Sequence, residues 1–190
     1  MTNAVIKREL RKKLLNRRRA LSDAERRAYS QRIWSIVEAT KEYREAKSIM
    51  AFASMPDEIA SLRFLQRAIA DGKEVHIPRI TGCGIITAAR LYSTEELLPA
   101  AFDILEPPKI NPITDPAMID LMLISGVGFT ESGDRLGMGG GYYDRFLPLA
   151  TGAARIAVAF SCQLVEMIPI DATDQGVDVV ITEQGIIKCR

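Results

Sequence analysis

The stretch Arg135-Leu-Gly-Met-Gly-Gly-Gly-Tyr-Tyr-Asp144 combines glycine, arginine and aspartate in a pattern suited to binding phosphate. An apolar run at 119–124 precedes it and apolar residues at helical spacing follow it, so it joins a buried strand to a helix start. Its four glycines leave backbone N–H groups uncovered, and a helix start adds partial positive charge. A simple tight turn rarely needs four glycines in five positions. The stretch therefore predicts a nucleotide-phosphate site.

Charged side chains beside the glycines support this prediction. Arg135 and Arg145 flank them, and guanidinium forks match phosphate oxygens, although a residue at the position of Arg145 can also point to solvent. Asp144 falls in the first helical turn, where it can hold a cation shared by phosphates. The pattern is neither a P-loop, since no Gly-Lys-Ser/Thr occurs, nor a dinucleotide fingerprint, since Tyr142 stands where a third glycine is required.

Other kinds of site are disfavoured by the cysteine and histidine content. Cys83, Cys162 and Cys189 are far apart and form no Cys-x-x-Cys, which argues against disulfides and a zinc site. The single histidine, His76, lies within an apolar stretch and is better interpreted as a core residue. Metal chemistry therefore falls to carboxylates, and carboxylates with phosphates indicate Mg²⁺.

Composition is that of an ordinary globular protein. The chain has 190 residues, of which 47% are hydrophobic and 26% charged, and no apolar run approaches the ~20 residues of a membrane span. No secretory signal pattern is present, so a cytoplasmic protein is expected. Residues 1–27 hold ten Lys/Arg against three Asp/Glu, which suits an anionic ligand or nucleic acid, although a solvated helix face is the better interpretation of most of these charges.

Apolar runs of strand length alternate with helix-length segments. The predicted strands are 47–54, 74–80, 85–91, 119–124, 155–160 and 177–182, with 185–188 as an edge strand. Ser22-x-x-Glu25 is a capping box that begins a second helix, and Asp71-Gly72 ends a helix that carries Leu62. This order predicts a Rossmann-like α/β fold: a single three-layer domain over 1–190, with a mostly parallel sheet and helices on both faces.

Loops that follow parallel strands meet at one edge of the sheet, where ligands bind. We therefore expect 54–58, 126–141 and 161–162 at this edge, together with the loop that delivers Asp178.

Five separated motifs, spread over most of the chain, resemble the 5-formyltetrahydrofolate cyclo-ligase family, also called 5,10-methenyltetrahydrofolate synthetase. They are Lys7-Arg-Glu-Leu-Arg11, Met55-Pro-Asp-Glu-Ile59, Glu106-Pro107, Arg135–Asp144 and Val177-Asp-Val-Val-Ile-Thr182. The chain departs from the family pattern at Ser125, at Met138 between the glycines, and at Ala60-Ser61. Met138 and Ala60-Ser61 concern substrate affinity and range more than the reaction.

The resemblance implies a role for each matching residue. ATP binding falls to Lys7, Arg8, Arg11, Arg135, Leu136, Gly137, Met138, Gly139, Gly140, Gly141, Tyr142, Tyr143 and Arg145. Binding of the folate substrate falls to Ala53, Met55, Glu58, Met138, Gly139, Gly140, Gly141 and Tyr142. The catalytic residues are Lys7, Arg135 and Asp144, and the Mg²⁺ ligands are Asp144 and Asp178.

The implied reaction is the closure of 5-formyltetrahydrofolate to 5,10-methenyltetrahydrofolate, with Mg²⁺ as cofactor and ATP as co-substrate. The γ-phosphoryl group activates the formyl oxygen, N10 attacks the carbon, and phosphate departs. The expected partners are these small molecules, with a monomeric protein that binds neither membrane nor nucleic acid.

Two alternatives remain open at this stage. A domain of this fold can keep the nucleotide loop as an inactive nucleotide- or RNA-binding module, although Glu58, Asp144 and Asp178 are all present. An enzyme acting on sugar phosphates or CoA is the other alternative, because a fold does not determine a function.

Overall fold

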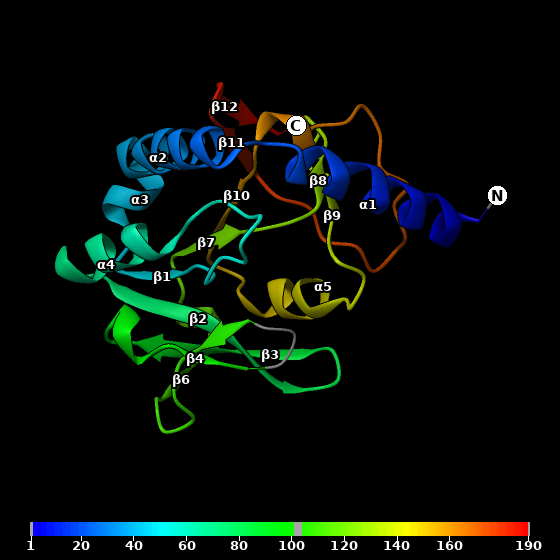
Figure 1. Ribbon diagram of the computed structural model, residues 1–190. Helices are drawn as coiled ribbons and strands as arrows, with labels where there is room; N and C mark the ends of the chain where they lie inside the picture. Colours follow the sequence, from blue (N-terminus) through cyan, green and yellow to red (C-terminus); the bar gives the residue numbers. More distant parts are fainter. Residues whose placement is uncertain (1, 101–103, 190) are drawn as a thin grey trace.

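An eight-stranded sheet forms the centre of the computed structural model, which describes residues 2–100 and 104–189 (Figure 1). The strand order is β12-β11-β10-β7-β1-β2-β3-β6. The bounds are β1 Ser48–Met50, β2 Glu74–Gly82, β3 Ile85–Leu91, β6 Ile113–Thr114, β7 Leu121–Ile124, β10 Ala154–Val158, β11 Val179–Thr182 and β12 Gly185–Lys188. From β11 to β2 neighbouring strands are parallel, whereas β12, β3 and β6 pair antiparallel. The predicted mostly parallel sheet is confirmed.

The α-helices are α1 Asn3–Arg19, α2 Asp23–Ala39, α3 Lys41–Glu45, α4 Leu62–Ala70 and α5 Tyr142–Phe146. Two predicted helix signals are confirmed, since the capping box begins α2 and Asp71-Gly72 follows the end of α4, whereas the short helix α3 was not predicted. The capping box before α2 is formed, since the Glu25 N–H donates to Ser22 Oγ at 3.3 Å and the Ser22 N–H donates to Glu25 Oε2 at 2.8 Å. No helix within the described ranges combines the length and apolar content needed to cross a membrane.

Successive strand residues point to opposite faces of the sheet and build two separate cores. Ile49 belongs to the core beneath α2 and α4, where the rings of Trp34 and Phe64 stack at 4.1 Å between centroids. Its neighbour Met50 belongs to the core on the other face, which Phe146 of α5 fills. Helices therefore cover both faces, as predicted, while α1 lies apart from α2–α4 near α5 (Figure 1).

The central strands are shorter than predicted, and two small hairpins were not foreseen. β1 stops at Met50, so 51–54, expected at the end of that strand, belong instead to the loop over 51–61. The hairpins pair β4 Leu98–Pro99 with β5 Leu105–Glu106 and β8 Gly128–Phe129 with β9 Arg135–Leu136. The second hairpin gives Arg135 a fixed backbone ahead of the glycines.

The single histidine is a fully buried core residue with both ring nitrogens paired. His76 Nδ1 lies 3.2 Å from the Ile49 carbonyl oxygen, and Nε2 lies 2.8 Å from Thr114 Oγ1. Burial lowers the pKa of His76 below its ordinary value of 6.5. The interpretation of His76 as a core residue is confirmed.

We expect His76 to make the protein less stable as the pH falls below about 6.5. Below that pH the unfolded chain binds a proton on His76, whereas the folded chain keeps the imidazole neutral. The free energy of unfolding therefore falls by at most about 1.4 kcal/mol per pH unit. Urea unfolding at several pH values between 7.5 and 5 measures this, and His76→Gln should show a smaller decrease than the wild type. Because other groups titrate in both proteins, equal slopes would contradict the prediction.

Candidate active site

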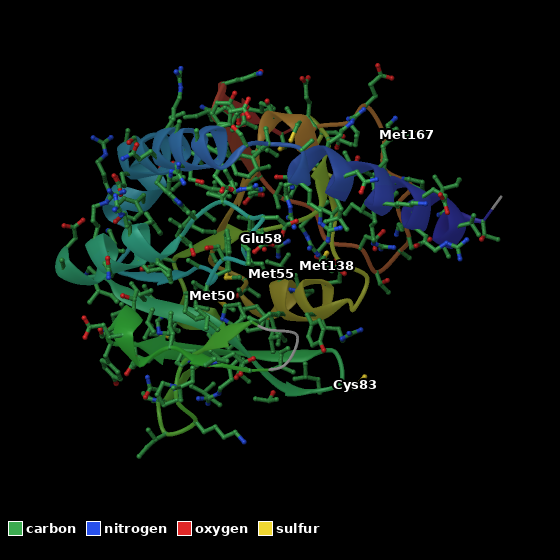
Figure 2. The ribbon with its side chains drawn as sticks, viewed as in Figure 1. Met50, Met55, Glu58, Cys83, Met138 and Met167 are labelled. Carbon is green, nitrogen blue, oxygen red and sulfur yellow. The ribbon has the colours of Figure 1, made fainter. Side chains whose placement is uncertain are left out.

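A cavity of about 1290 Å³ lies at the carboxyl edge of the sheet, bordered by α1, α5 and the loops after β1 and β7. The predicted site residues that line it are Lys7, Arg11, Ala53, Met55, Glu58, Arg135, Leu136, Gly137, Met138, Gly139, Gly140, Gly141, Tyr142, Tyr143, Asp144 and Arg145. In Figure 2, Met55, Glu58 and Met138 lie near one another between α1 and α5. Residues 161–162 are not part of this lining within the described chain.

Arg135 and Asp144 form a largely buried ion pair in the wall of this cavity. Arg135 Nη2 lies 2.6 Å from Asp144 Oδ1, and the two side chains are 3% and 23% exposed. The guanidinium carbon lies 5.4 Å from the centre of the Tyr143 ring, which packs beside it. Among the described residues, Arg135 Nε is buried without a hydrogen-bond partner. A buried cation with a spare donor is suited to an incoming anion.

The glycine loop exposes its backbone to the cavity and is fixed by Arg11. Arg11 Nε donates to the Gly137 carbonyl at 2.8 Å, which joins α1 to the loop. Gly139 has a φ of 103°, a conformation that side chains with a Cβ rarely adopt. Since α5 has only five residues, the uncovered N–H groups and the arginines contribute most of the positive potential, and the helix dipole little.

Arg145 is held by backbone carbonyls. Its Nε donates to the Gly84 oxygen at 2.7 Å, and its Nη2 donates to the Gly140 oxygen. Arg145 thus ties the turn between β2 and β3 to the glycine loop, where sequence reasoning expected a phosphate ligand or a solvated side chain.

Lys7 is paired with a loop near the end of the chain that sequence reasoning did not place in the site. Lys7 Nζ lies 2.6 Å from Asp171 Oδ2 and also contacts Asp174. Burial alone would lower the pKa of Lys7, but hydrogen bonds to these two carboxylates raise it above its ordinary value. Asp171, Asp174 and Gln175 all line the cavity, and the Gln175 N–H donates to Asp144 Oδ1 at 3.3 Å.

Glu58 lies in the other half of the cavity, where the walls are apolar. Its Oε2 accepts the Met55 N–H at 3.0 Å, and its Oε1 lies 3.5 Å from Arg18 Nη1. Burial raises the pKa of Glu58 despite these two contacts. Phe52 and Ile77 line the same cavity and give a planar ring an apolar surface.

Ala60-Ser61, one of the departures from the family pattern, supports this loop from behind. The Ser54 and Ser61 N–H groups donate to each other's hydroxyl oxygens at 3.0 and 3.1 Å, and Trp34 Nε1 donates to the Ala60 carbonyl at 2.7 Å. Neither residue lines the cavity.

Arg18 lines the cavity and was not predicted as a site residue. A signal existed, because Lys7, Arg11, Leu14 and Arg18 follow one another at spacings of four, three and four and therefore share one face of α1. Lys7, Leu14 and Arg18 are the buried residues of that helix.

Asp178 does not join Asp144, which corrects the predicted pair of metal ligands. It precedes β11, so it lies at the amino edge of the sheet, opposite the cavity. Its Oδ2 accepts the Arg155 N–H at 2.8 Å, and Asp120 accepts backbone N–H groups at the same edge. Arg8 is likewise outside the cavity lining, with a side chain that is 74% exposed.

A magnesium site must therefore use the carboxylates that do line the cavity. The described residues contain no cluster of three or more His, Cys, Asp or Glu that would hold a metal alone. Mg²⁺ bound with nucleotides commonly takes one or two carboxylates and completes its shell with phosphates and water. Asp144 fits this donor set, and the loop that carries Asp174 is bonded to it through Gln175.

Comparisons with known proteins identify the same family over most of the chain. Residues 3–183 match the model of the 5-formyltetrahydrofolate cyclo-ligase family. The 5-formyltetrahydrofolate cyclo-ligase of Mus musculus is 34% identical over 191 residues, covering 94% of each chain. That of Escherichia coli K12 is 27% identical over 175 residues, covering 90% of this chain and 96% of the other.

Solved structures give the same result. The NMR structure of Aquifex aeolicus 5,10-methenyltetrahydrofolate synthetase superposes with a TM-score of 0.86 at 34% identity, covering 97% of this chain and 93% of that one. The Mycoplasma pneumoniae synthetase superposes with a TM-score of 0.75 at 25% identity, covering 93% and 98%. Sequence, fold and cavity thus point the same way: the chain belongs to the 5-formyltetrahydrofolate cyclo-ligase family.

Proposed function

We propose that this protein converts 5-formyltetrahydrofolate and ATP to 5,10-methenyltetrahydrofolate, ADP and phosphate in the presence of Mg²⁺. The observation that carries the proposal is that one cavity joins two chemically different halves. One half contains Glu58 against apolar walls, and the other contains the glycine loop with Arg135 and Asp144. A planar pterin suits the first half, and ATP phosphates suit the second.

The nucleotide half supplies charge and backbone donors from three parts of the chain. Lys7 and Arg11 come from α1, Arg135 comes from β9, and the N–H groups come from Gly139 and its neighbours. In the other half, Glu58 accepts hydrogen bonds from the N–H groups of the pterin, with Met55 beside it. In the proposed arrangement the γ-phosphate would lie near the formyl group of the folate.

The reaction itself asks for positioning and charge neutralisation. The formyl oxygen attacks the γ-phosphorus, the bond to the β-phosphate oxygen breaks, and ADP leaves. N10 then attacks the activated carbon, the C–O bond breaks to release phosphate, and N10 loses its proton to solvent. Arg135 balances charge on the transferred phosphoryl group, and the cavity holds N10 near the carbon. His76 and the three cysteines are absent from the described lining, which agrees with a reaction that needs no side-chain nucleophile.

Magnesium, when bound, neutralises the negative charge that the phosphates share. We propose Asp144 as its first protein ligand and Asp174 in place of Asp178 as the second. Asp174 would then exchange its contact with Lys7 for the metal, which leaves Lys7 paired with Asp171 and with N–H donors to spare for the phosphates. We also propose that residues 1–190 act as one catalytic domain; the monomeric state and the cytoplasmic location remain predictions.

The direct test follows the near-ultraviolet absorbance of the methenyl product. Purified protein is mixed with 5-formyltetrahydrofolate, ATP and Mg²⁺, and ADP is measured in parallel. We expect product and ADP in equal amounts, and neither when ATP is omitted or Mg²⁺ is chelated. Folded protein that binds ATP by calorimetry yet forms no product would refute the proposal.

A further inference from the structure

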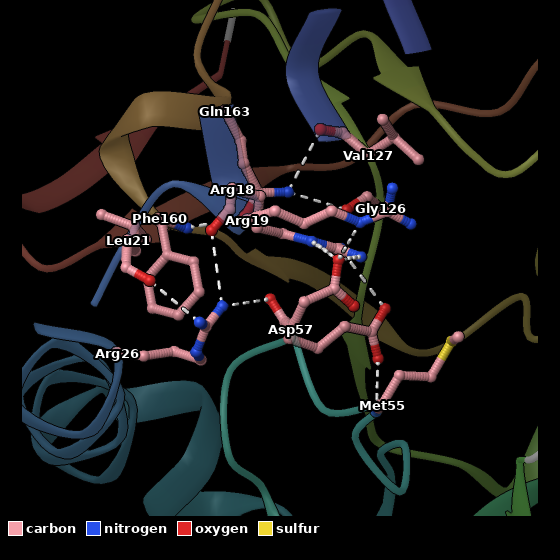
Figure 3. A network of polar contacts seen from close by, with 11 residues as sticks. Arg18, Arg19, Leu21, Arg26, Met55, Asp57, Gly126, Val127, Phe160 and Gln163 are labelled. Carbon is pink, nitrogen blue, oxygen red and sulfur yellow. Dashed lines mark hydrogen bonds and ion pairs between the residues drawn. The ribbon is translucent and has the colours of Figure 1, made fainter. Parts of the chain in front are cut away.

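A network of three charged side chains, two of which line the cavity, lies in the wall of its folate half (Figure 3). Arg18, in the last turn of α1, donates from Nε and Nη2 to Asp57 Oδ2 at 3.2 and 3.0 Å. Its remaining terminal nitrogen, Nη1, lies 3.5 Å from Glu58 Oε1. The guanidinium therefore bridges two consecutive carboxylates of the loop after β1.

All three side chains are largely withdrawn from water. Arg18 is 3% exposed, Glu58 13% and Asp57 19%. Burial opposes ionisation of Asp57, but the charge and hydrogen bonds of Arg18 lower the pKa of Asp57 below its ordinary value. Arg19 also approaches Asp57, at 3.5 Å, but its side chain is 62% exposed. Arg18 is thus the buried cation on which both carboxylates depend.

The backbone around this network is fixed from a second helix. Arg26 of α2 donates from Nη1 to the carbonyl oxygens of Arg18 and Asp57 at 3.4 and 3.5 Å. Its Nη2 donates to the Leu21 carbonyl at 2.9 Å. The end of α1 and the loop that carries Glu58 are therefore held in one arrangement, and the Arg18 guanidinium has a defined place.

We propose that Arg18 is a positioning residue for the folate substrate: anchored on Asp57, it holds the Glu58 carboxylate ionised and directed into the cavity. This inference rests on the proposed function, in which Glu58 binds the pterin. A pterin edge offers neighbouring N–H donors, and an ionised carboxylate can accept from them with both oxygens. Burial raises the pKa of Glu58, and Arg18 is the cation that opposes this shift.

The groups that face Glu58 determine the direction in which each substitution should shift its pKa. Arg18 from α1 favours the ionised form, as does the Met55 N–H. Asp57, beside it, disfavours the ionised form through like charge. Tyr143 from α5 is also near, but burial raises its pKa, so it stays neutral. Removing Arg18 should therefore raise the pKa of Glu58, and removing the charge of Asp57 should lower it.

The first measurement is a ¹³C NMR titration of protein labelled at the glutamate carboxyl carbons. Glu58→Gln identifies the Glu58 signal. We expect Arg18→Gln to move its midpoint to higher pH, Asp57→Asn to move it to lower pH, and the matched control Arg19→Gln to leave it near the wild type. If the two substitutions only loosened the loop, the Glu58 midpoint would shift in the same direction in Arg18→Gln and in Asp57→Asn.

Arg18→Gln leaves Asp57 buried beside only an exposed partner, so folding is checked by circular dichroism. If that variant does not fold, Arg18→Gln with Asp57→Asn removes both charges. Its Glu58 midpoint should still lie above that of the wild type, because Arg18 acts on Glu58 more strongly than Asp57 does. An unmoved midpoint, or equal directions for Arg18→Gln and Asp57→Asn, would overturn the inference.

The second measurement is steady-state kinetics as a function of pH. Arg18→Gln should raise KM for 5-formyltetrahydrofolate about tenfold or more, with KM for ATP near the wild-type value. In Arg18→Gln the acid limb of the pH profile of kcat/KM for the folate should shift to higher pH, as the NMR midpoint does. Arg18→Lys should return the acid limb to its wild-type pH and recover part of the lost substrate affinity. A rise in KM that is equal at all pH values, with an unmoved titration, would mean direct contact with the substrate and would overturn the inference.

The two proposals fail in different ways. A wild-type protein that shows no turnover would refute the proposed function. Shifts of the Glu58 midpoint in opposite directions in Arg18→Gln and Asp57→Asn would still show that Arg18 favours the ionised form of Glu58.

Discussion

Replacing Arg135 with glutamine is expected to lower kcat about 10³-fold while leaving the protein folded. The reason is that Arg135 brings a permanent positive charge to a largely buried position in the nucleotide half of the cavity. Charge that develops on a transferring phosphoryl group is stabilised most strongly by donors that are fixed and withdrawn from water. Glutamine keeps a polar group at this position but removes the charge and the fork.

The measurement is kcat at saturating ATP and folate. Arg135→Lys keeps the charge without the paired donors and should fall between glutamine and the wild type. Arg79 offers a matched control, because it is a buried arginine that donates to the carbonyl oxygens of Pro108 and Asn111 away from the cavity. Arg79→Gln should reduce stability with little change in kcat. A kcat for Arg135→Gln within tenfold of the wild type would remove Arg135 from the catalytic residues.

Replacing Gly139 with alanine is expected to lower kcat/KM for ATP about 100-fold. At a φ of 103° alanine is strained, and its Cβ would lie 3.4 Å from the Arg11 guanidinium carbon. The loop is exposed, so it can relieve strain of roughly 1–3 kcal/mol by changing its backbone. That change displaces the N–H groups from the phosphates, and displacement by about 1 Å suffices for such a loss.

Gly72→Ala separates backbone strain from disturbance of the site. Gly72 also has a positive φ, of 79°, and is exposed, but its Cβ would meet nothing within 4 Å and it does not line the cavity. We expect it to lower the free energy of unfolding with little effect on kcat/KM. Equal kinetic losses in the two variants would show that Gly139 acts through stability alone.

Much of the sheet could be predicted, because a strand buried on both faces is apolar along its length. The predicted bounds of β2, β3, β10, β11 and β12 hold to within two residues at each end, and β12 is the predicted edge strand. The hairpins β4–β5 and β8–β9 were missed because two residues are too few to show a periodicity. The pairing of β8 with β9 also depends on a turn whose geometry a local pattern does not specify.

The candidate site was predictable where a motif is contiguous and less so where distant segments meet. The glycine stretch and Glu58 lie in the cavity, as expected. The loop that delivers Asp178 was expected at the ligand edge, and Asp178 was assigned to the metal by resemblance; both expectations were wrong, because a residue before a parallel strand lies at the opposite edge. Asp171 and Asp174 lie in a polar loop without local signal, because their contact with Lys7 spans more than 160 positions.

That long-range contact has a consequence for how the protein is made. Lys7 is synthesised 164 residues before Asp171, which at 5–20 residues per second is a delay of roughly 8–33 s. For most of this interval Leu14 lacks its partners Val127 and Leu136, so α1 leaves the ribosome with an uncovered apolar face. A ligand stabilises only the state that binds it, so one bound by the finished cavity gives no protection to the growing chain. Helix α1 therefore stays accessible to chaperones and proteases until the strands that cover Leu14 have been made.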